Sequence, residues 1–154
     1  MHYRIYLSST FTEAGGFDWK KVLIDSFNAC SKFKESNCAT FIDPLLFESK
    51  QNPIAVQSDM DNIANADVVF FHVEKPTIGT LMEVAFSCMN FPTQLRYFIS
   101  NNPEVFNHTW IKNLTLERPN CGGNKRLYPM KACHSVQEAV DRFMQDTNNE
   151  ENKE

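Results

Sequence analysis

Hydrophobic and polar positions along the chain follow two different periods. Residues 3–9 (YRIYLSS) alternate and then end in small polar residues, which predicts a strand followed by a loop over residues 8–16. Residues 17–33 instead carry apolar side chains at helical spacing, and Asp18 is suited to cap that helix. Residues 38–43 (CATFID) predict a second strand, which Pro44 stops. The chain therefore opens as strand, helix, strand.

The same succession continues to the C-terminus. Residues 67–73 (DVVFFHV) are nearly all apolar, as is typical of a central strand covered on both faces. Further strands are predicted over residues 94–100 and within 126–132, where Pro129 confines the strand to an edge or an end. Helices are predicted over residues 57–66 with Ser58 as N-cap, 76–91, 105–114 and 135–146 with Ser135 as its first residue.

Strands that alternate with helices predict an α/β fold. We expect a flavodoxin/Rossmann-like parallel sheet of about five strands, with helices on both faces. With 154 residues and no long linker, the chain predicts a single domain over residues 1–146. Residues 147–154 (TNNEENKE) are polar and acidic, so we expect them to form a disordered tail.

Composition excludes several classes of function. A net charge of −4 argues against a general nucleic-acid binder, and no apolar run is long enough to span a membrane. The first ten residues lack the pattern of a signal peptide. Five scattered cysteines without CxxC spacing indicate reduced thiols, so we expect a cytoplasmic protein. No metal-binding pattern is present.

Residues 76–86 (PTIGTLMEVAF) raise the question of what Glu83 does. Apolar residues cover nearly the whole circumference of this predicted helix, which indicates a buried helix. A carboxylate is almost never buried without a partner or a task. Arg4 or Arg96 could be its structural partner. Alternatively, Glu83 faces a ligand, because ligands of such folds lie beyond the carboxyl ends of the strands.

The turn before Glu83 suits an anion. Thr77 follows Pro76 as a candidate N-cap, and Gly79 lets a ligand approach the backbone. A helix N-terminus offers free N–H groups and a positive dipole end, which can hold a phosphate. Capping alone would also explain Thr77. His72, in the middle of a strand, is interpreted as a core histidine satisfied by the sheet.

Residues 59–87 (DMDNIANADVVFFHVEKPTIGTLMEVAFS) resemble the core of the nucleoside 2-deoxyribosyltransferase superfamily. They look closest to its nucleoside 5′-monophosphate N-glycosidase branch, which includes the 2-deoxynucleoside 5′-phosphate N-hydrolases. Residues 5–11 (IYLSSTF) resemble the first strand of that family, and the likeness covers roughly residues 3–16 and 57–100. The matching positions are Asp59, Ala66, Asp67, Val68, Val69, Pro76, Thr77, Gly79, Glu83 and Ala85.

This resemblance implies a hydrolase that cleaves the N-glycosidic bond of a (deoxy)nucleoside 5′-monophosphate to free base and pentose 5-phosphate. Glu83 would be the nucleophile, and Asp59 would orient it or handle a proton. Tyr6 would hydrogen-bond the nucleophile or the sugar, although a core aromatic is an equal alternative. No metal or organic cofactor is implied. The rival functions are a nucleoside 2-deoxyribosyltransferase and a non-catalytic nucleotide-binding or sensing module.

The resemblance also implies a phosphate site and a dimer. Transferases of the family carry an Asp where this chain has Thr77, and the nucleotide hydrolases carry an Arg that the first loop here lacks. Hydroxyls and backbone N–H groups would then bind the phosphate, from Ser8, Ser9, Thr10, Thr77 and Gly79. Family members complete each site from a neighbouring subunit, so we expect a homodimer. Residues 101–113 would place His108 or Thr109 at the partner's phosphate, with Phe106, Trp110 and Ile111 as exposed apolar residues of the interface.

Overall fold

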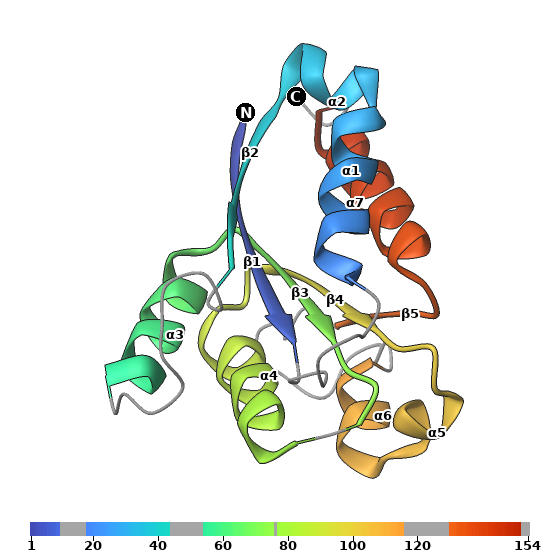
Figure 1. Ribbon diagram of the computed structural model, residues 1–154. Helices are drawn as coiled ribbons and strands as arrows, with labels where there is room; N and C mark the ends of the chain where they lie inside the picture. The colour runs from blue at the N-terminus through green and yellow to red at the C-terminus, as the bar shows by residue number, and fades with distance from the viewer. Residues whose placement is uncertain (10–17, 44–53, 76, 116–129, 152–154) are drawn as a thin grey trace, which may run out of the picture.

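The computed structural model of the protein describes residues 1–9, 18–43, 54–75, 77–115 and 130–151. Its five strands form one parallel sheet in the order β2-β1-β3-β4-β5 (Figure 1). This is the predicted flavodoxin/Rossmann-like α/β architecture. The strands are β1 (His2–Ser9), β2 (Cys38–Ile42), β3 (Val68–His72), β4 (Leu95–Ile99) and β5 (Lys131–Cys133).

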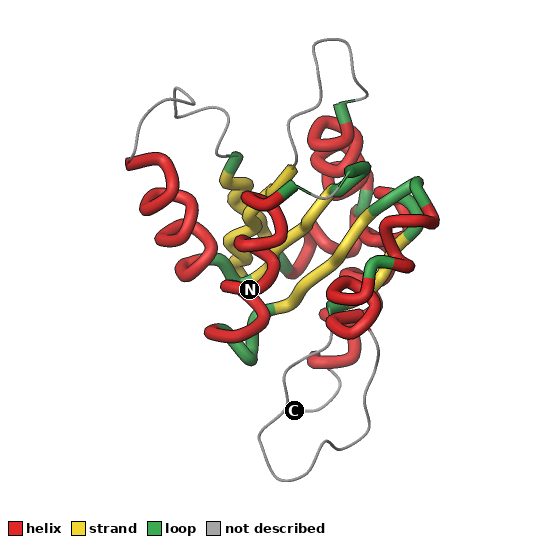
Figure 2. Tube along the Cα trace, turned by 90° about the horizontal axis from the view of Figure 1, so that it is seen from below, coloured by secondary structure: helices red, strands yellow, loops and turns green. Residues whose placement is uncertain are grey.

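Helices cover both faces of the sheet. One face packs against α1 and α7, and the other packs against α3 and α4, so the strands lie as a layer between helices (Figures 1 and 2). The helices are α1 (Trp19–Ala29), α2 (Ser31–Ser36), α3 (Ile54–Asn65), α4 (Ile78–Asn90), α5 (Pro103–Asn107), α6 (Thr109–Thr115) and α7 (Val136–Glu151). β3 is buried along its whole length, as its apolar run predicts.

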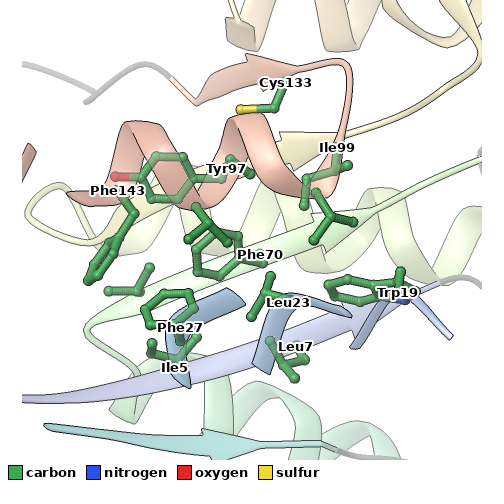
Figure 3. Close-up of a cluster of buried hydrophobic side chains, with 14 of the residues drawn as sticks. Ile5, Leu7, Trp19, Leu23, Phe27, Phe70, Tyr97, Ile99, Cys133 and Phe143 are labelled. Atoms are coloured by element: carbon green, nitrogen blue, oxygen red, sulfur yellow. The ribbon is translucent and has the colours of Figure 1, made fainter. Parts of the chain in front are cut away.

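The core on the side of α1 and α7 is rich in aromatic rings (Figure 3). Phe70 of β3 stacks on Tyr97 of β4, with 4.9 Å between ring centroids. Phe27 of α1 lies 5.2 Å from Phe143 of α7 between ring centroids. Such offset and edge contacts add to the free energy of burying these large side chains. They fix α1, and with it the first turn of that helix, against the sheet.

Two predicted helices are each divided in two. The helix expected over residues 17–33 ends at Ala29 and resumes at Ser31, because Cys30 has an extended backbone. The helix expected over residues 105–114 is broken at His108, which is also extended. Asp18 caps α1 as predicted, since its carboxylate accepts from the Lys21 N–H at 3.1 Å. The breaks come at residues of modest helix propensity, which periodicity alone does not reveal.

Two helix ends also differ from the sequence prediction. α3 begins at Ile54, so Ser58 lies inside the helix and is not its N-cap. α7 continues to Glu151 and buries Thr147, whose hydroxyl donates to the Phe143 carbonyl oxygen at 3.1 Å. The boundary expected at residue 147 therefore falls within α7, and residues 152–154 lie outside the described part of the chain.

α4 is not buried all round, contrary to the prediction from its composition. Ile78, Met82 and Met89 are 81%, 56% and 73% exposed, whereas Val84 and Cys88 are buried. The helix thus has one face on the sheet and one apolar face in solvent. Among the described residues, no helix is both long and apolar enough to cross a membrane. Four described cysteines are free thiols, and Cys121 lies outside the described residues.

Candidate functional site

β1 presents two hydroxyl groups on the face that packs against α3 and α4. Tyr6 and Ser8 are two residues apart in a strand, so they point to the same side with Cα atoms about 7 Å apart. The Tyr6 hydroxyl donates to Asp59 Oδ1 of α3 at 3.1 Å. The Ser8 hydroxyl donates to Glu83 Oε2 of α4. Two carboxylates from two helices are therefore held side by side along one strand.

This group of four residues, the carboxylate cluster (Tyr6, Ser8, Asp59 and Glu83), lies towards the carboxyl end of β1. In the strand order, β1 lies beside β3, and the helices that follow these two strands, α1 and α4, lie on opposite faces of the sheet. Such a switch point is where ligands bind in open parallel sheets. The fold thus brings together, by direct contact or charge, four of the residues that the sequence singles out.

Burial is the main reason why the pKa of Glu83 rises to about 7. The negative charge of Asp59 raises this pKa further, whereas the Ser8 hydrogen bond and the Lys20 ammonium lower it. Asp59 and Glu83 therefore interact electrostatically. Near neutral pH, Glu83 is present as both acid and carboxylate, which is the range in which a carboxyl group can exchange protons or act as a nucleophile.

Neither arginine considered as a structural partner binds Glu83 in the described residues. Arg4 Nε lies 3.7 Å from Asp67 Oδ2 at the opposite end of the sheet. Arg96 of β4 is buried and binds Ser87, one turn of α4 beyond Glu83: its Nε donates to Ser87 Oγ at 2.8 Å, and its Nη2 donates to the Ser87 carbonyl oxygen at 2.7 Å. The alternative of an arginine–Glu83 ion pair is therefore wrong.

The N-terminus of α4 has the geometry of a cap with free space beside it. Thr77 Oγ1 accepts from the Thr80 N–H at 3.4 Å and lies 3.1 Å from the Thr80 hydroxyl. Both Thr77 and Gly79 are exposed, and a Cβ placed on Gly79 would meet no atom of the described residues within 4 Å. Thr77 therefore caps the helix, and the backbone at Gly79 is open to a ligand.

The opposite wall of the site, on the side of α1, has polar residues that sequence reasoning missed. Lys20 is buried and forms an ion pair with Asp43, the residue after β2. The signal was present in the sequence, because Lys20, Leu23 and Phe27 share one helical face, so a lysine stands in an apolar stripe. Trp19 stacks on His72 of β3, with 5.0 Å between ring centroids and 9° between planes.

His72 is in the core as predicted, but it is not fully satisfied. Burial lowers its pKa, and Glu74 raises it by a smaller amount. Its Nε2 lies 3.4 Å from Glu74 Oε1, yet no described residue meets this nitrogen with hydrogen-bond geometry. A buried nitrogen without a partner costs free energy, so it calls for an explanation.

Of the remaining predicted site residues, none whose side chain the structure describes is joined to the carboxylate cluster. The Ser9 side chain and Thr10 lie outside what the structure describes. His108 and Thr109 are exposed at the break between α5 and α6. Ile111 is buried and Phe106 packs on Phe98, so the prediction of exposed apolar residues is wrong for these two. Trp110 is 65% exposed, as expected for an interface residue.

Within the described ranges, no three His, Cys, Asp or Glu side chains gather as a metal site. Neither family models, nor curated proteins, nor solved structures gave a match to this chain. The architecture and the geometry of the site are therefore the grounds for a functional proposal.

Proposed function

We propose that the protein is a hydrolase that cleaves the N-glycosidic bond of a nucleoside 5′-monophosphate. The observation that carries this proposal is the carboxylate cluster, in which Glu83 and Asp59 are held by hydroxyls two residues apart on β1. Paired carboxylates of unequal environment are the usual equipment for breaking glycosidic bonds. The resemblance of residues 59–87 to nucleotide N-glycosidases supports the same class.

In the proposed reaction, ionised Glu83 attacks the anomeric carbon. A bond forms between Oε and that carbon, the carbon–nitrogen bond breaks, and its electron pair leaves with the base. Asp59 is placed to move the proton that the departing nitrogen or the incoming water requires. Water then cleaves the glycosyl ester and releases pentose 5-phosphate with regenerated Glu83. A carboxylate also stabilises the positive charge that develops on the sugar ring.

In this scheme the Ser8 hydroxyl affects the ionisation of Glu83, and the Tyr6 hydroxyl holds Asp59 in place. Ser8 stabilises the charged form of Glu83 and thereby opposes the effect of burial. Tyr6 fixes Asp59 at 3.1 Å, which keeps the second carboxylate in one orientation. We assign the phosphate end of the substrate to the N-terminus of α4, where Thr77 and Gly79 are exposed.

Chromatographic detection of free base tests this function. Wild-type protein is incubated with each common ribo- and deoxyribonucleoside 5′-monophosphate and with the matching nucleosides. We expect base release from at least one monophosphate, and loss of that release in Glu83→Gln. Glu35→Gln, on an exposed position of α2, is the matched control and should behave as wild type.

The same assay distinguishes the rival functions. Adding a second base and finding a new nucleoside would identify a nucleoside 2-deoxyribosyltransferase. Binding of a nucleotide without release of base would identify a non-catalytic binding or sensing module. No binding and no release with any of these compounds would refute the whole proposal.

We also propose a homodimer with shared sites, formed through residues 101–113. Exposed Trp110 beside exposed His108 and Thr109 supports this assignment, because aromatic side chains next to hydrogen-bonding groups suit the centre of an interface. Light scattering at micromolar concentration should give twice the chain mass of 17.8 kDa. An active monomer would contradict the proposal.

Mixing two inactive variants tests whether sites are shared. One chain carries Glu83→Gln and the other carries His108→Ala with Thr109→Ala. In a mixed dimer with shared sites, one site holds both defects and the other holds neither, so activity should recover. Failure to recover, despite proven exchange of subunits, would mean that each site is built within one chain.

A further inference from the structure

Lys20 is an unusual residue for its position in the fold. It is 8% exposed in the first turn of α1, on the stripe that Leu23 and Phe27 bury against the sheet. Lysine is almost never buried to this extent without a partner, because removing an ammonium group from water is costly. Its partner is Asp43 Oδ1. A buried ion pair adds little net stability, so the fold itself does not require this one.

The register of the sheet places this pair beside the carboxylate cluster. Ile42 of β2 pairs with Tyr6 of β1, so Asp43 follows opposite Leu7, one residue before Ser8. The pair therefore lies at the carboxyl end of β1, on the face opposite Glu83. An ammonium group has three hydrogen-bond donors. In the described part of the chain, Asp43 is the acceptor that Lys20 meets, which leaves donors for a ligand.

His72 provides a second, independent observation on the same wall. It is 4% exposed, and its Nε2 has no hydrogen-bond partner among the described residues. Its ring lies against Trp19, the residue before Lys20. It also pairs in register with Ser9, the last residue of β1. A buried imidazole nitrogen without a partner, which donates a hydrogen bond in the tautomer that carries its proton, is suited to an oxyanion when a buried cation with spare donors lies on the same wall.

We propose that Lys20 and His72 form an anion subsite on the α1 wall, which binds the phosphate of the ligand. The inference rests on the proposed function for the identity of that phosphate as part of a nucleoside 5′-monophosphate. The subsite supplies a positive charge that residues 8–16 lack, because that segment contains no Lys or Arg. A phosphate would thus meet the N-terminus of α4 on one side and a cation on the other.

NMR of the histidine rings tests the subsite in the wild-type protein. The chain has four histidines: His2, His72, His108 and His134. Inorganic phosphate is titrated at constant ionic strength and pH, and His72→Phe assigns the signal of His72. We expect saturable movement of the His72 signals and none of the signals of His2 and His134. Movement of His108 alone, or of no histidine, would overturn the inference.

A pair of matched double variants measures the contribution of the lysine. Lys20→Met with Asp43→Asn removes the buried ion pair and leaves the net charge unchanged. Lys21→Met with Asp25→Asn removes an exposed ion pair from the same helix, and it also preserves net charge. We expect the first variant to bind inorganic phosphate at least about tenfold more weakly, as for the loss of a charged hydrogen bond. The second should bind as wild type.

Three ligands separate this inference from the proposed function. Inorganic phosphate, a nucleoside 5′-monophosphate and its nucleoside are compared in wild type and in the buried-pair variant. Weaker binding of both phosphate compounds, with unchanged nucleoside binding, supports the subsite even if no base is ever released. Base release with an unchanged Michaelis constant for the monophosphate would keep the function and overturn the subsite. If the variant does not fold by circular dichroism, the wild-type histidine titration decides.

Discussion

Two polar clusters lie on the same face of α4, one helical turn apart, and they differ in how their charges are satisfied. At Ser87, every contact is a matched donor and acceptor: Arg96 Nε donates to Ser87 Oγ at 2.8 Å, and Ser87 donates to Gln94. Gln94 Nε2 in turn donates to the carbonyl oxygens of Ile63 and Ala66, at 2.7 and 2.8 Å. In the carboxylate cluster, by contrast, the negative charges of Glu83 and Asp59 repel one another.

The comparison indicates different tasks for the two clusters. The Ser87 cluster ties the C-terminal ends of α3 and α4 to the start of β4 through neutral acceptors, so it stabilises the fold. The carboxylate cluster holds Glu83, whose pKa is raised to about 7 because the folded state opposes ionisation of this carboxyl group. Polar groups that cost stability and lie where ligands bind are candidates for function.

Substituting one residue in each cluster should produce different defects, a loss of turnover in one case and a loss of stability in the other. Glu83→Gln should lower turnover by at least ~10³-fold, as expected when a nucleophile is removed, without loss of stability. Ser87→Ala should keep turnover but lower the free energy of unfolding by about 1–3 kcal/mol, because it leaves buried polar groups unpaired. Base release and urea denaturation measure the two effects. Near-normal turnover in Glu83→Gln would rule out the proposed mechanism.

Removing the arginine of the Ser87 cluster should be the most destabilising single change discussed here. Arg96→Met should reduce the free energy of unfolding by about 3 kcal/mol, because buried carbonyl oxygens at the end of α4 lose a charged donor. Arg4→Met is the control, since Arg4 is exposed and its ion pair with Asp67 contributes little. Equal effects of the two changes, by urea denaturation, would mean that the Ser87 cluster does not stabilise the fold.

Much of the fold follows from the sequence because its signal is local. The apolar run of residues 67–73 predicts a strand buried on both faces, and β3 is that strand. The breaks at Cys30 and His108 are not encoded by periodicity, because an amphipathic stripe continues across them. The exposed apolar face of α4 could not be predicted either, since hydrophobicity does not state which side meets the sheet.

The candidate site was predictable only in part. Glu83 is conspicuous as a lone carboxylate in an apolar helix, and Asp59 and Tyr6 entered through a resemblance. The contacts Tyr6–Asp59 and Ser8–Glu83 join residues 53 and 75 positions apart, so they depend on packing of α3 and α4 against β1. The Lys20–Asp43 pair likewise requires the register of β2 on β1. Such long-range contacts have no local sequence signal.

The free energy of unfolding of Glu83→Gln should depend on pH in a defined direction. Folding raises the pKa of Glu83 from 4.5 to about 7, so the folded state binds the proton more tightly. The ionised side chain therefore destabilises the protein increasingly as pH rises from 4.5 to 7. Glu83→Gln should be more stable than wild type at pH 8, by at most about 3 kcal/mol, and no more stable at pH 4. Urea denaturation at both pH values measures this, and a gain at pH 4 alone would contradict the assigned environment.

The pH dependence of kcat/KM should report the same carboxyl group. Activity that needs ionised Glu83 should rise with pH, with an acidic limb near 7. Asp59→Asn removes a charge that raises this pKa, so its residual activity should show the limb at lower pH. Tyr6→Phe leaves that charge in place and serves as the control. If the limb stays at the same pH in Asp59→Asn, the charge of Asp59 does not affect the pKa of Glu83.

The smallest expected effect concerns the hydroxyl at the N-terminus of α4. Thr77→Val keeps the shape of the side chain but removes both the cap of Thr80 N–H and a donor for an oxyanion. It should raise the Michaelis constant for monophosphates about threefold to tenfold, the range of one neutral hydrogen bond. Unphosphorylated nucleosides should be affected far less, because they have no group that reaches Thr77. Thr77→Ser retains the hydroxyl and should behave as wild type for both. Equal effects of Thr77→Val on both substrates would mean that Thr77 only caps the helix, and they would favour the transferase alternative, in which the substrate has no phosphate.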